Sequence, residues 1–191
     1  MYVQAASEIG DVQVRNAGTI GGSIAHADPA ADWPAVLIAS NAQIIVQNNN
    51  ENREIDADSF FTGFYDTALG EGEIITSIRI PLTASNRHSA YAKFKQPASR
   101  FAIVGCAVAV SMDGGTIQDI RIGMTGLSES AYRVKSAEAA MMGKSLSADT
   151  IAGLNVDVTE GNPVMSDHYA SEKYRTHLAG VYMRRALRQL L

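Results

Sequence analysis

Three successive strand-like segments in the second half of the chain constrain its fold most strongly. Residues 90–96, 102–112 and 116–125 are each long enough to form a strand, and the second of them is almost wholly apolar. Asp113-Gly114-Gly115 stands between the second and third segments and is typical of a hairpin turn. Successive strands joined by short turns pair antiparallel. The sequence therefore predicts a three-stranded antiparallel sheet.

Helices are predicted after these strands. Residues 133–142 form the first and end at Gly143, and residues 150–154 form the second, with Ser147 or Asp149 as its cap. Residues 155–168 are irregular. The longest helix runs from Ser171 nearly to Leu191. Its predicted buried side consists of Tyr174, Leu178, Val181, Tyr182, Leu187 and Leu190.

The first half of the chain predicts a separate set of elements. A helix over residues 3–9 ends at Gly10, and residues 12–14 are extended. A second helix is capped by Asp28 and runs to Ser40. Short strands are predicted at residues 42–47, 54–56 and 73–80, and the aromatic residues Phe60, Phe61, Phe64 and Tyr65 are predicted to lie in the core. The polar residues 82–89 form a boundary. The fold class is therefore α+β, with one domain over residues 1–83 and another over residues 88–191.

The segment 19–32 carries the strongest chemical signal. Gly21-Gly22 lies between the hydroxyl residues Thr19 and Ser23, and a glycine turn of this kind can gather backbone N–H groups around an anion. Asp28 and Asp32 follow and add carboxylates. This combination suits a cofactor that carries phosphate and hydroxyl groups. A structural glycine turn and simple helix capping by the two aspartates are the alternatives.

Composition excludes several classes of function. The formal net charge of −4 provides no basic surface for nucleic acid. The single cysteine excludes an internal disulfide framework and an all-cysteine metal cluster within the chain. The longest apolar run, residues 101–110, is too short to cross a membrane, and the start of the chain does not have the pattern of a secretory signal. We therefore expect a cytoplasmic protein without a membrane span.

Other reactive residues have structural explanations. Ser23, His26 and the nearby aspartates do not form a hydrolase signature, since the chain has no G-x-S-x-G elbow. The four histidines lack the spacing of a metal site. Cys106 lies inside an apolar strand and is predicted to be a buried thiol, and Tyr91 is predicted to be structural.

The run from Val14 to Asp32, VRNAGTIGGSIAHADPAAD, resembles the second FAD-binding motif of molybdenum hydroxylase flavoproteins. These are the medium subunits of carbon monoxide dehydrogenase and the FAD domains of xanthine dehydrogenase and aldehyde oxidase. The resemblance continues through EIITSIRIP at residues 73–81 and YAKFKQPASRFAIV at residues 91–104, and residues 118–191 resemble the family's C-terminal domain. It implies the second lobe of a PCMH-type FAD-binding domain, followed by a carbon monoxide dehydrogenase flavoprotein C-terminal-type domain.

The same resemblance implies FAD as the cofactor and assigns the site residues. Thr19, Ile20, Gly21, Gly22 and Ser23 would contact the FAD diphosphate and neighbouring groups. Asp32 would bond the ribityl or flavin polar edge, Ile75 would pack near the ring system, and Lys95 would lie near the flavin. The implied function is electron transfer in an oxidoreductase complex with a molybdenum-cofactor large subunit and a 2Fe-2S small subunit. Electrons would pass from Fe–S clusters to FAD and then to an external acceptor.

The resemblance also implies a first FAD-binding lobe ahead of the position of Met1, with its own glycine-rich phosphate loop. A separate chain carrying that lobe would complete the site. The alternative is a truncated, non-catalytic homologue that acts as an assembly or protein-interaction module without flavin. On that alternative, an apolar face left open by the absent lobe would favour a homo-oligomer or another partner.

Overall fold

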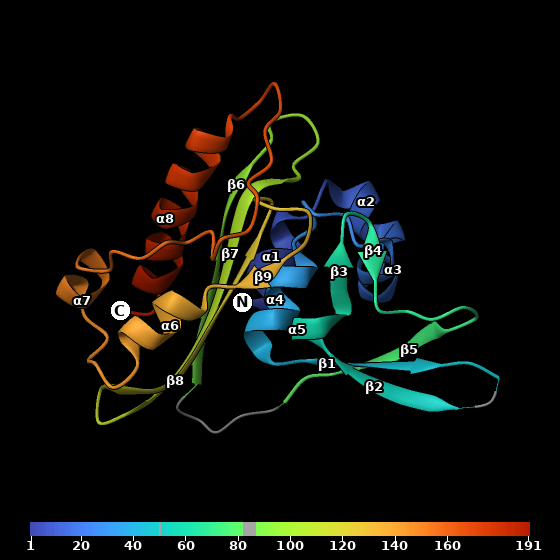
Figure 1. Cartoon of the computed structure of the whole chain (residues 1–191), viewed down its shortest axis with the longest axis horizontal. Coiled ribbons are helices and arrows are strands. Elements are labelled where there is room, and N and C mark those ends of the chain that lie inside the picture. The colour runs from blue at the N-terminus through green and yellow to red at the C-terminus, as the bar shows by residue number, and fades with distance from the viewer. Residues whose placement is uncertain (50, 82–86) are drawn as a thin grey trace.

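The strands predicted in the second half form the central sheet of the molecule (Figure 1). The computed structural model describes residues 1–49, 51–81 and 87–191. Its large sheet has the order β6-β7-β8-β9, and every neighbouring pair is antiparallel. The strands are β6 (Arg87–Lys95), β7 (Ala102–Asp113), β8 (Thr116–Thr125) and β9 (Tyr132–Arg133). The three long strands and the antiparallel fold are confirmed, and β9 adds a fourth strand of two residues.

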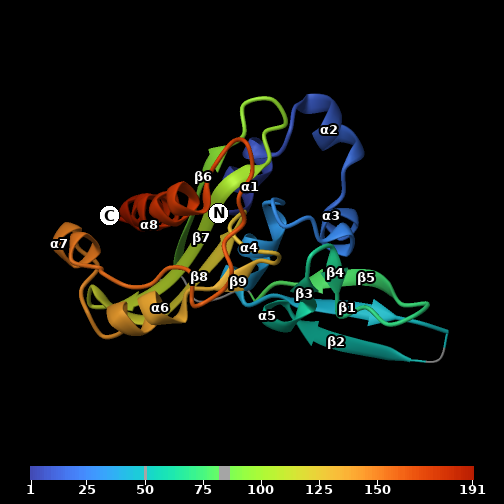
Figure 2. The same ribbon diagram turned by 45° about the horizontal axis from the view of Figure 1, so that its top comes forward.

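Helices cover both faces of this sheet (Figures 1 and 2). On one face lie α6 (Lys135–Met141), α7 (Ala148–Ala152) and α8 (Glu172–Arg188); on the other lie α1 (Tyr2–Glu8) and α4 (Trp33–Ser40). Side chains alternate across β7, so Cys106 and Val108 belong to the core under α8, whereas Ala107 belongs to the core under α4. This explains the almost continuous apolar sequence of β7, which is buried on both sides.

A smaller sheet extends away from the large one (Figure 2). Its strand order is β2-β1-β5, with both pairs antiparallel. Its strands are β1 (Gln43–Gln47), β2 (Asn52–Asp56) and β5 (Ile74–Arg79). The short α5 (Ala57–Phe60) leads into a two-stranded hairpin of β3 (Phe61–Gly63) and β4 (Asp66–Thr67). Every residue of α4 is buried between this half and the large sheet.

Two expectations for the first half are wrong. Residues 12–14 are not extended but begin α2 (Val12–Ala17), because the Asp11 side chain caps the helix by accepting a hydrogen bond from the Val14 amide at 2.9 Å. The helix expected after Asp28 begins later, at Trp33. Residues 29–31 instead bond to the large sheet: the Gly126 amide donates to the Pro29 carbonyl at 2.8 Å, and the Ala102 amide donates to the Ala30 carbonyl at 3.1 Å.

The aromatic cluster divides between core and surface. Phe60 and Phe61 are buried as predicted. The prediction that Phe64 and Tyr65 lie in the core is wrong, since they are 57% and 47% exposed. Tyr174 on α8 is also exposed, because the buried side of α8 is centred on Leu178, Ala179, Tyr182, Met183, Ala186 and Leu187.

Cys106 is buried as expected, and Tyr91, for which the sequence predicts only a structural role, is buried as well. Of the expected boundary at 82–89, residues 82–86 lie outside the described residues, and Arg87–Ser89 begin β6. In the described part of the chain, no helix combines the length and apolar character needed to cross a membrane.

Candidate functional site at helix α3

The Thr19–Ser23 segment starts a helix rather than forming a glycine turn. The Thr19 hydroxyl accepts a hydrogen bond from the Gly22 amide at 2.9 Å and caps α3 (Ile20–His26). Gly21 and Gly22 are inside this helix, and neither has a positive φ. The predicted glycine turn and its nest of N–H groups are therefore wrong, because the threonine cap favours a helix at this point.

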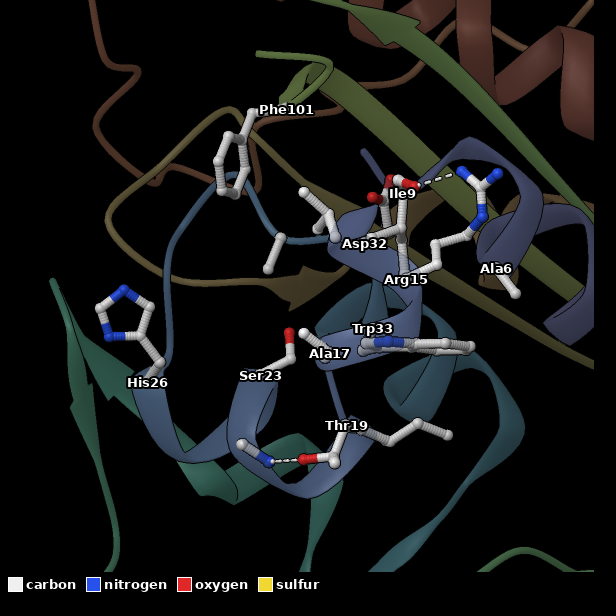
Figure 3. Close-up of a pocket in the computed structure, with 15 residues that line it drawn as sticks. Ala6, Ile9, Arg15, Ala17, Thr19, Ser23, His26, Asp32, Trp33 and Phe101 are labelled. Carbon is white, nitrogen blue, oxygen red and sulfur yellow. Dashed lines mark hydrogen bonds between the residues drawn. The ribbon is translucent and has the colours of Figure 1, made fainter. Parts of the chain in front are cut away.

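A cavity of about 590 Å³ lies beside this helix (Figure 3). Its walls come from α1, α2, α3, the start of α4 and the loop before β7. The lining residues are Ala6, Ile9, Val14, Arg15, Ala17, Gly18, Thr19, Ile20, Gly22, Ser23, His26, Ala31, Asp32, Trp33 and Phe101. Apolar walls with a few polar groups are typical of a site for an organic cofactor.

The cavity brings together most of the predicted site residues. Thr19, Ile20, Gly22, Ser23 and Asp32 line it. In the described ranges the Ser23 hydroxyl has no hydrogen-bond partner within the chain, so it is free to bond to a ligand.

Three predicted residues do not line the cavity. Gly21 faces open space, since a Cβ added there would meet no atom within 4 Å. Ile75 is half-buried on β5, opposite Val46. The Lys95 ammonium lies 2.9 Å from Glu8 Oε2 in an ion pair that is open to solvent.

Asp32 is the most strongly held polar group of the cavity. Its Oδ2 accepts a hydrogen bond from Lys93 Nζ at 2.8 Å, and its Oδ1 accepts one from the Tyr91 hydroxyl. Lys93 Nζ also donates to the Glu8 carbonyl at 3.1 Å. Burial raises the pKa of Asp32, while the charge of Lys93 and both hydrogen bonds act in the opposite direction. Burial and the adjacent Asp32 carboxylate raise the pKa of Tyr91 well above its ordinary value, so Tyr91 remains a donor.

Two arginines fix the connection between α1 and α2. Arg15 Nη1 donates to the carbonyls of Ile9 at 2.7 Å and Gly10 at 3.1 Å, and Figure 3 shows Arg15 directed toward Ile9. Arg100 Nη1 donates to the same Gly10 carbonyl at 2.9 Å, from the loop between β6 and β7. These bonds fix one wall of the cavity.

Sequence reasoning missed Phe101 and Lys93 as parts of this region. Phe101 is 45% exposed and lines both this cavity and a second cavity of about 540 Å³. A large aromatic residue directly after a polar loop is a signal that could have identified it. Lys93 interrupts an apolar strand, which is the corresponding signal for a buried charge with a specific partner.

Two family models match the chain. The FAD binding domain in molybdopterin dehydrogenase matches residues 1–83, and the CO dehydrogenase flavoprotein C-terminal domain matches residues 89–190. The first match contains the helix α3 region and most of the cavity wall, and the second contains the large sheet.

Curated relatives and solved structures agree with these matches. The carbon monoxide dehydrogenase medium chain of Hydrogenophaga pseudoflava is 36% identical over 188 residues, which are 98% of this chain and 65% of that protein. The glyceraldehyde dehydrogenase medium chain of Sulfolobus acidocaldarius is 34% identical over 97% of this chain and 66% of that protein. The carbon monoxide dehydrogenase structure from Hydrogenophaga pseudoflava superimposes with a TM-score of 0.88 at 38% identity, over 100% of this chain and 66% of that one. The reconstituted CO dehydrogenase from Oligotropha carboxidovorans gives 0.91 at 31% identity, over 98% and 65%. The chain thus spans slightly less than two thirds of the length of these relatives.

Proposed function

Because the chain belongs to the family of FAD-binding medium chains of molybdenum hydroxylases, we propose that it forms part of an FAD-binding electron-transfer subunit. Its partners in this proposal are a molybdenum-cofactor large subunit and a 2Fe-2S small subunit. When bound, FAD accepts electrons that originate at the molybdenum site and delivers them to an external acceptor. The residues of this chain bind and orient the cofactor, and substrate oxidation takes place on another subunit.

The observation that carries this proposal is the cavity itself, which lies on the segment matched by the FAD-binding domain. Thr19, Gly22 and Ser23 line it, and the Ser23 hydroxyl has no protein partner among the described residues. A free hydroxyl beside a glycine-containing helix suits a phosphate oxygen, because Gly22, which also lines the cavity, has no side chain to cover it. The donor set present therefore fits an FAD diphosphate.

The remaining site residues keep their predicted roles within the proposal. Asp32 accepts a hydrogen bond from the ribityl or flavin polar edge, and its carboxylate has acceptor capacity beyond the bonds to Lys93 and Tyr91. Ile75 and Lys95 lie outside the cavity lining and stay predictions for the edge of the site.

The organisation of the whole subunit is also a proposal. Residues 1–83 act as the second lobe of an FAD-binding domain, and residues 88–191 act as the C-terminal domain. The first lobe completes the FAD site from a separate chain or from another segment of the same protein. We place the complex in the cytoplasm.

Titration of the purified chain with FAD tests this function. We expect saturable binding, followed by flavin fluorescence and by equilibrium dialysis, and tighter binding when the first lobe is added. Ser23→Ala should weaken binding by roughly 10-fold, the value of one hydrogen bond to a charged group. Ser145→Ala, an exposed serine on the opposite half, is the matched control and should bind like the unaltered chain. Absence of FAD binding both with and without the first lobe would contradict the proposal.

Exposed apolar residues on α1 and α2 favour a second candidate, an assembly or protein-interaction module without flavin. Val3, Val12 and Val14 are 83%, 58% and 52% exposed. Covering these side chains with a partner or a second copy is favourable, because it removes their apolar surface from water. Native mass spectrometry separates the candidates: a stable oligomer that binds no FAD under any condition favours this one.

A further inference from the structure

We infer that Lys93 is a positioning residue that keeps the Asp32 carboxylate ionised and oriented at the cavity wall, so that this wall accepts a hydrogen bond from an N–H or O–H group of the ligand. The inference rests on the proposed function and identifies the cation that serves the site. The resemblance points to Lys95 for a cation near the flavin, whereas the structure places Lys93 against the cavity residue Asp32 and Lys95 against Glu8.

The positions of the two lysines along β6 explain why Lys93, and not Lys95, contacts Asp32. Side chains alternate along a strand, so Tyr91 and Lys93 share the face toward α1 and α4, while Ala92 and Phe94 face the core under α8. Lys95 lies on the same face as Lys93 but is the last residue of β6, beyond the buried part of the strand, where it meets Glu8 of α1. Lys93 therefore remains inside, with 1% of its side chain exposed, and the Lys95 side chain is 45% exposed.

Asp32 is placed to receive this cation instead of capping a helix. It occupies the residue before α4, but its carboxylate makes no capping bond. Both oxygens are directed to β6, one to Lys93 Nζ and one to the Tyr91 hydroxyl. Two donors from one strand fix the plane of the carboxylate, and about two of its acceptor positions remain for a ligand.

A buried carboxylate without a cation takes up a proton, because desolvation disfavours its charged form. A protonated Asp32 would donate a hydrogen bond where the ionised form accepts one. The cavity wall would then bind an acceptor of the ligand instead of an N–H or O–H group. Other charged and titratable groups face this region from every packed element. They include Tyr91 and Lys93 on β6, Glu8 on α1, Arg15 on α2, His26 on α3, Cys106 on β7 and Arg100 in the loop between β6 and β7. Lys93 is the cation in this set that contacts the Asp32 carboxylate.

The test compares Lys93→Met with Lys95→Met in the full chain. Two quantities are measured across about pH 5 to 8: the carboxyl ¹³C titration of Asp32 without ligand, and the dissociation constant of FAD. In Lys93→Met we expect the Asp32 midpoint to rise by at least about 1 pH unit. FAD binding should then weaken by roughly 10-fold or more as the pH falls through that midpoint. Lys95→Met should leave the Asp32 midpoint unchanged, and its FAD affinity should not change with pH around the raised midpoint seen in Lys93→Met.

Further variants separate positioning from packing. Lys93→Arg retains the charge and should restore both profiles, whereas Lys93→Met with Asp32→Asn should bind FAD weakly and independently of pH. Lys93→Gln replaces Lys93→Met if the latter does not fold. An unchanged Asp32 titration, or a flat FAD profile in Lys93→Met, overturns the inference. If the unaltered chain binds no FAD, the proposed function fails, and the carboxyl titration alone decides whether Lys93 keeps Asp32 ionised.

Discussion

At the residue scale, the two adjacent glycines of α3 have unequal surroundings. A Cβ added at Gly21 would meet no atom within 4 Å, while a Cβ at Gly22 would lie 2.9 Å from Thr19 Oγ1. Neither glycine has a positive φ, so the backbone conformation does not require glycine at these positions. What the two glycines provide is the space that a side chain would otherwise fill. At Gly22 this space holds the capping hydroxyl, and at Gly21 it is open to a ligand.

Gly21→Ala should therefore separate folding from binding. We expect the free energy of unfolding in urea to stay equal or to rise by up to about 1 kcal/mol, because alanine favours a helix. FAD affinity should fall by roughly 10-fold, since the new methyl group occupies the approach to α3. Gly22→Ala is the contrasting variant and should lose about 0.5–2 kcal/mol of stability through the displaced cap. Unchanged FAD affinity in Gly21→Ala would mean that the ligand does not pass this residue.

At the scale of elements, the sequence predicts what a long local pattern determines. The strands β6, β7 and β8 and the helix α8 extend over many residues of one period, so their assignments are correct. The two-residue β9 has no pattern, and the start of α4 depends on hydrogen bonds from the distant residues Ala102 and Gly126.

The candidate site, like the fold, could be predicted from the sequence only where local residues determine it. The composition of the Thr19–Ser23 segment and its resemblance to a known motif locate the cavity, but its helical form depends on the Thr19 cap. That Lys93 rather than Lys95 is buried depends on where β6 ends against α1 and α4, since both lysines lie on one face of the strand.

The small sheet contains an acid-sensitive link between β2 and the turn before β5. Glu73 accepts hydrogen bonds from Arg53 Nε at 2.6 Å and from the Gly70 amide at 2.6 Å. The hydrogen bond from Arg53 and the Gly70 amide hold the pKa of Glu73 at about 2, below its ordinary 4.5. Because the folded-state value is the lower one, this stabilisation is complete above about pH 4.5 and is lost as the pH falls toward 2.

Hydrogen exchange of the β1, β2 and β5 amides can measure this loss. We expect protection to decrease between pH 4.5 and 2 in the unaltered chain, after correction for the intrinsic exchange rate. Glu73→Gln should be less protected at neutral pH and should lack this acid-dependent step. Glu71→Gln, two residues earlier in the same turn, is the control and should behave like the unaltered chain. A step that persists in Glu73→Gln would assign the acid sensitivity to another carboxylate.

At the scale of the whole molecule, α4 joins the two halves into one structure. It lies in the core of the first half and packs on β7 and β8 of the second. The carbonyls at its C-terminal end accept hydrogen bonds from arginines of the large sheet, Ile38 from Arg121 at 3.0 Å and Ala39 from Arg87 at 3.2 Å. The Ile38 carbonyl also accepts a hydrogen bond from the amide of the C-cap residue Asn41 at 3.2 Å, so the large sheet adds to the hydrogen bonding at this end of α4.

This arrangement predicts a single cooperative unfolding transition for both halves, and Gly123 provides its test. A Cβ at Gly123 of β8 would overlap the Ala35 carbonyl oxygen and lie 3.1 Å from the carbonyl carbon, so α4 must shift as a unit. Gly123→Ala should cost about 1–3 kcal/mol and lower the melting temperature by about 2–4 °C for each kcal/mol. Gly63→Ala is the matched control, because its nearest contact is Asp66 Cβ at 3.8 Å. Calorimetry should give one transition with equal calorimetric and van't Hoff enthalpies in the unaltered chain. Two transitions there, or equal stability of Gly123→Ala and Gly63→Ala, would show that α4 does not couple the halves.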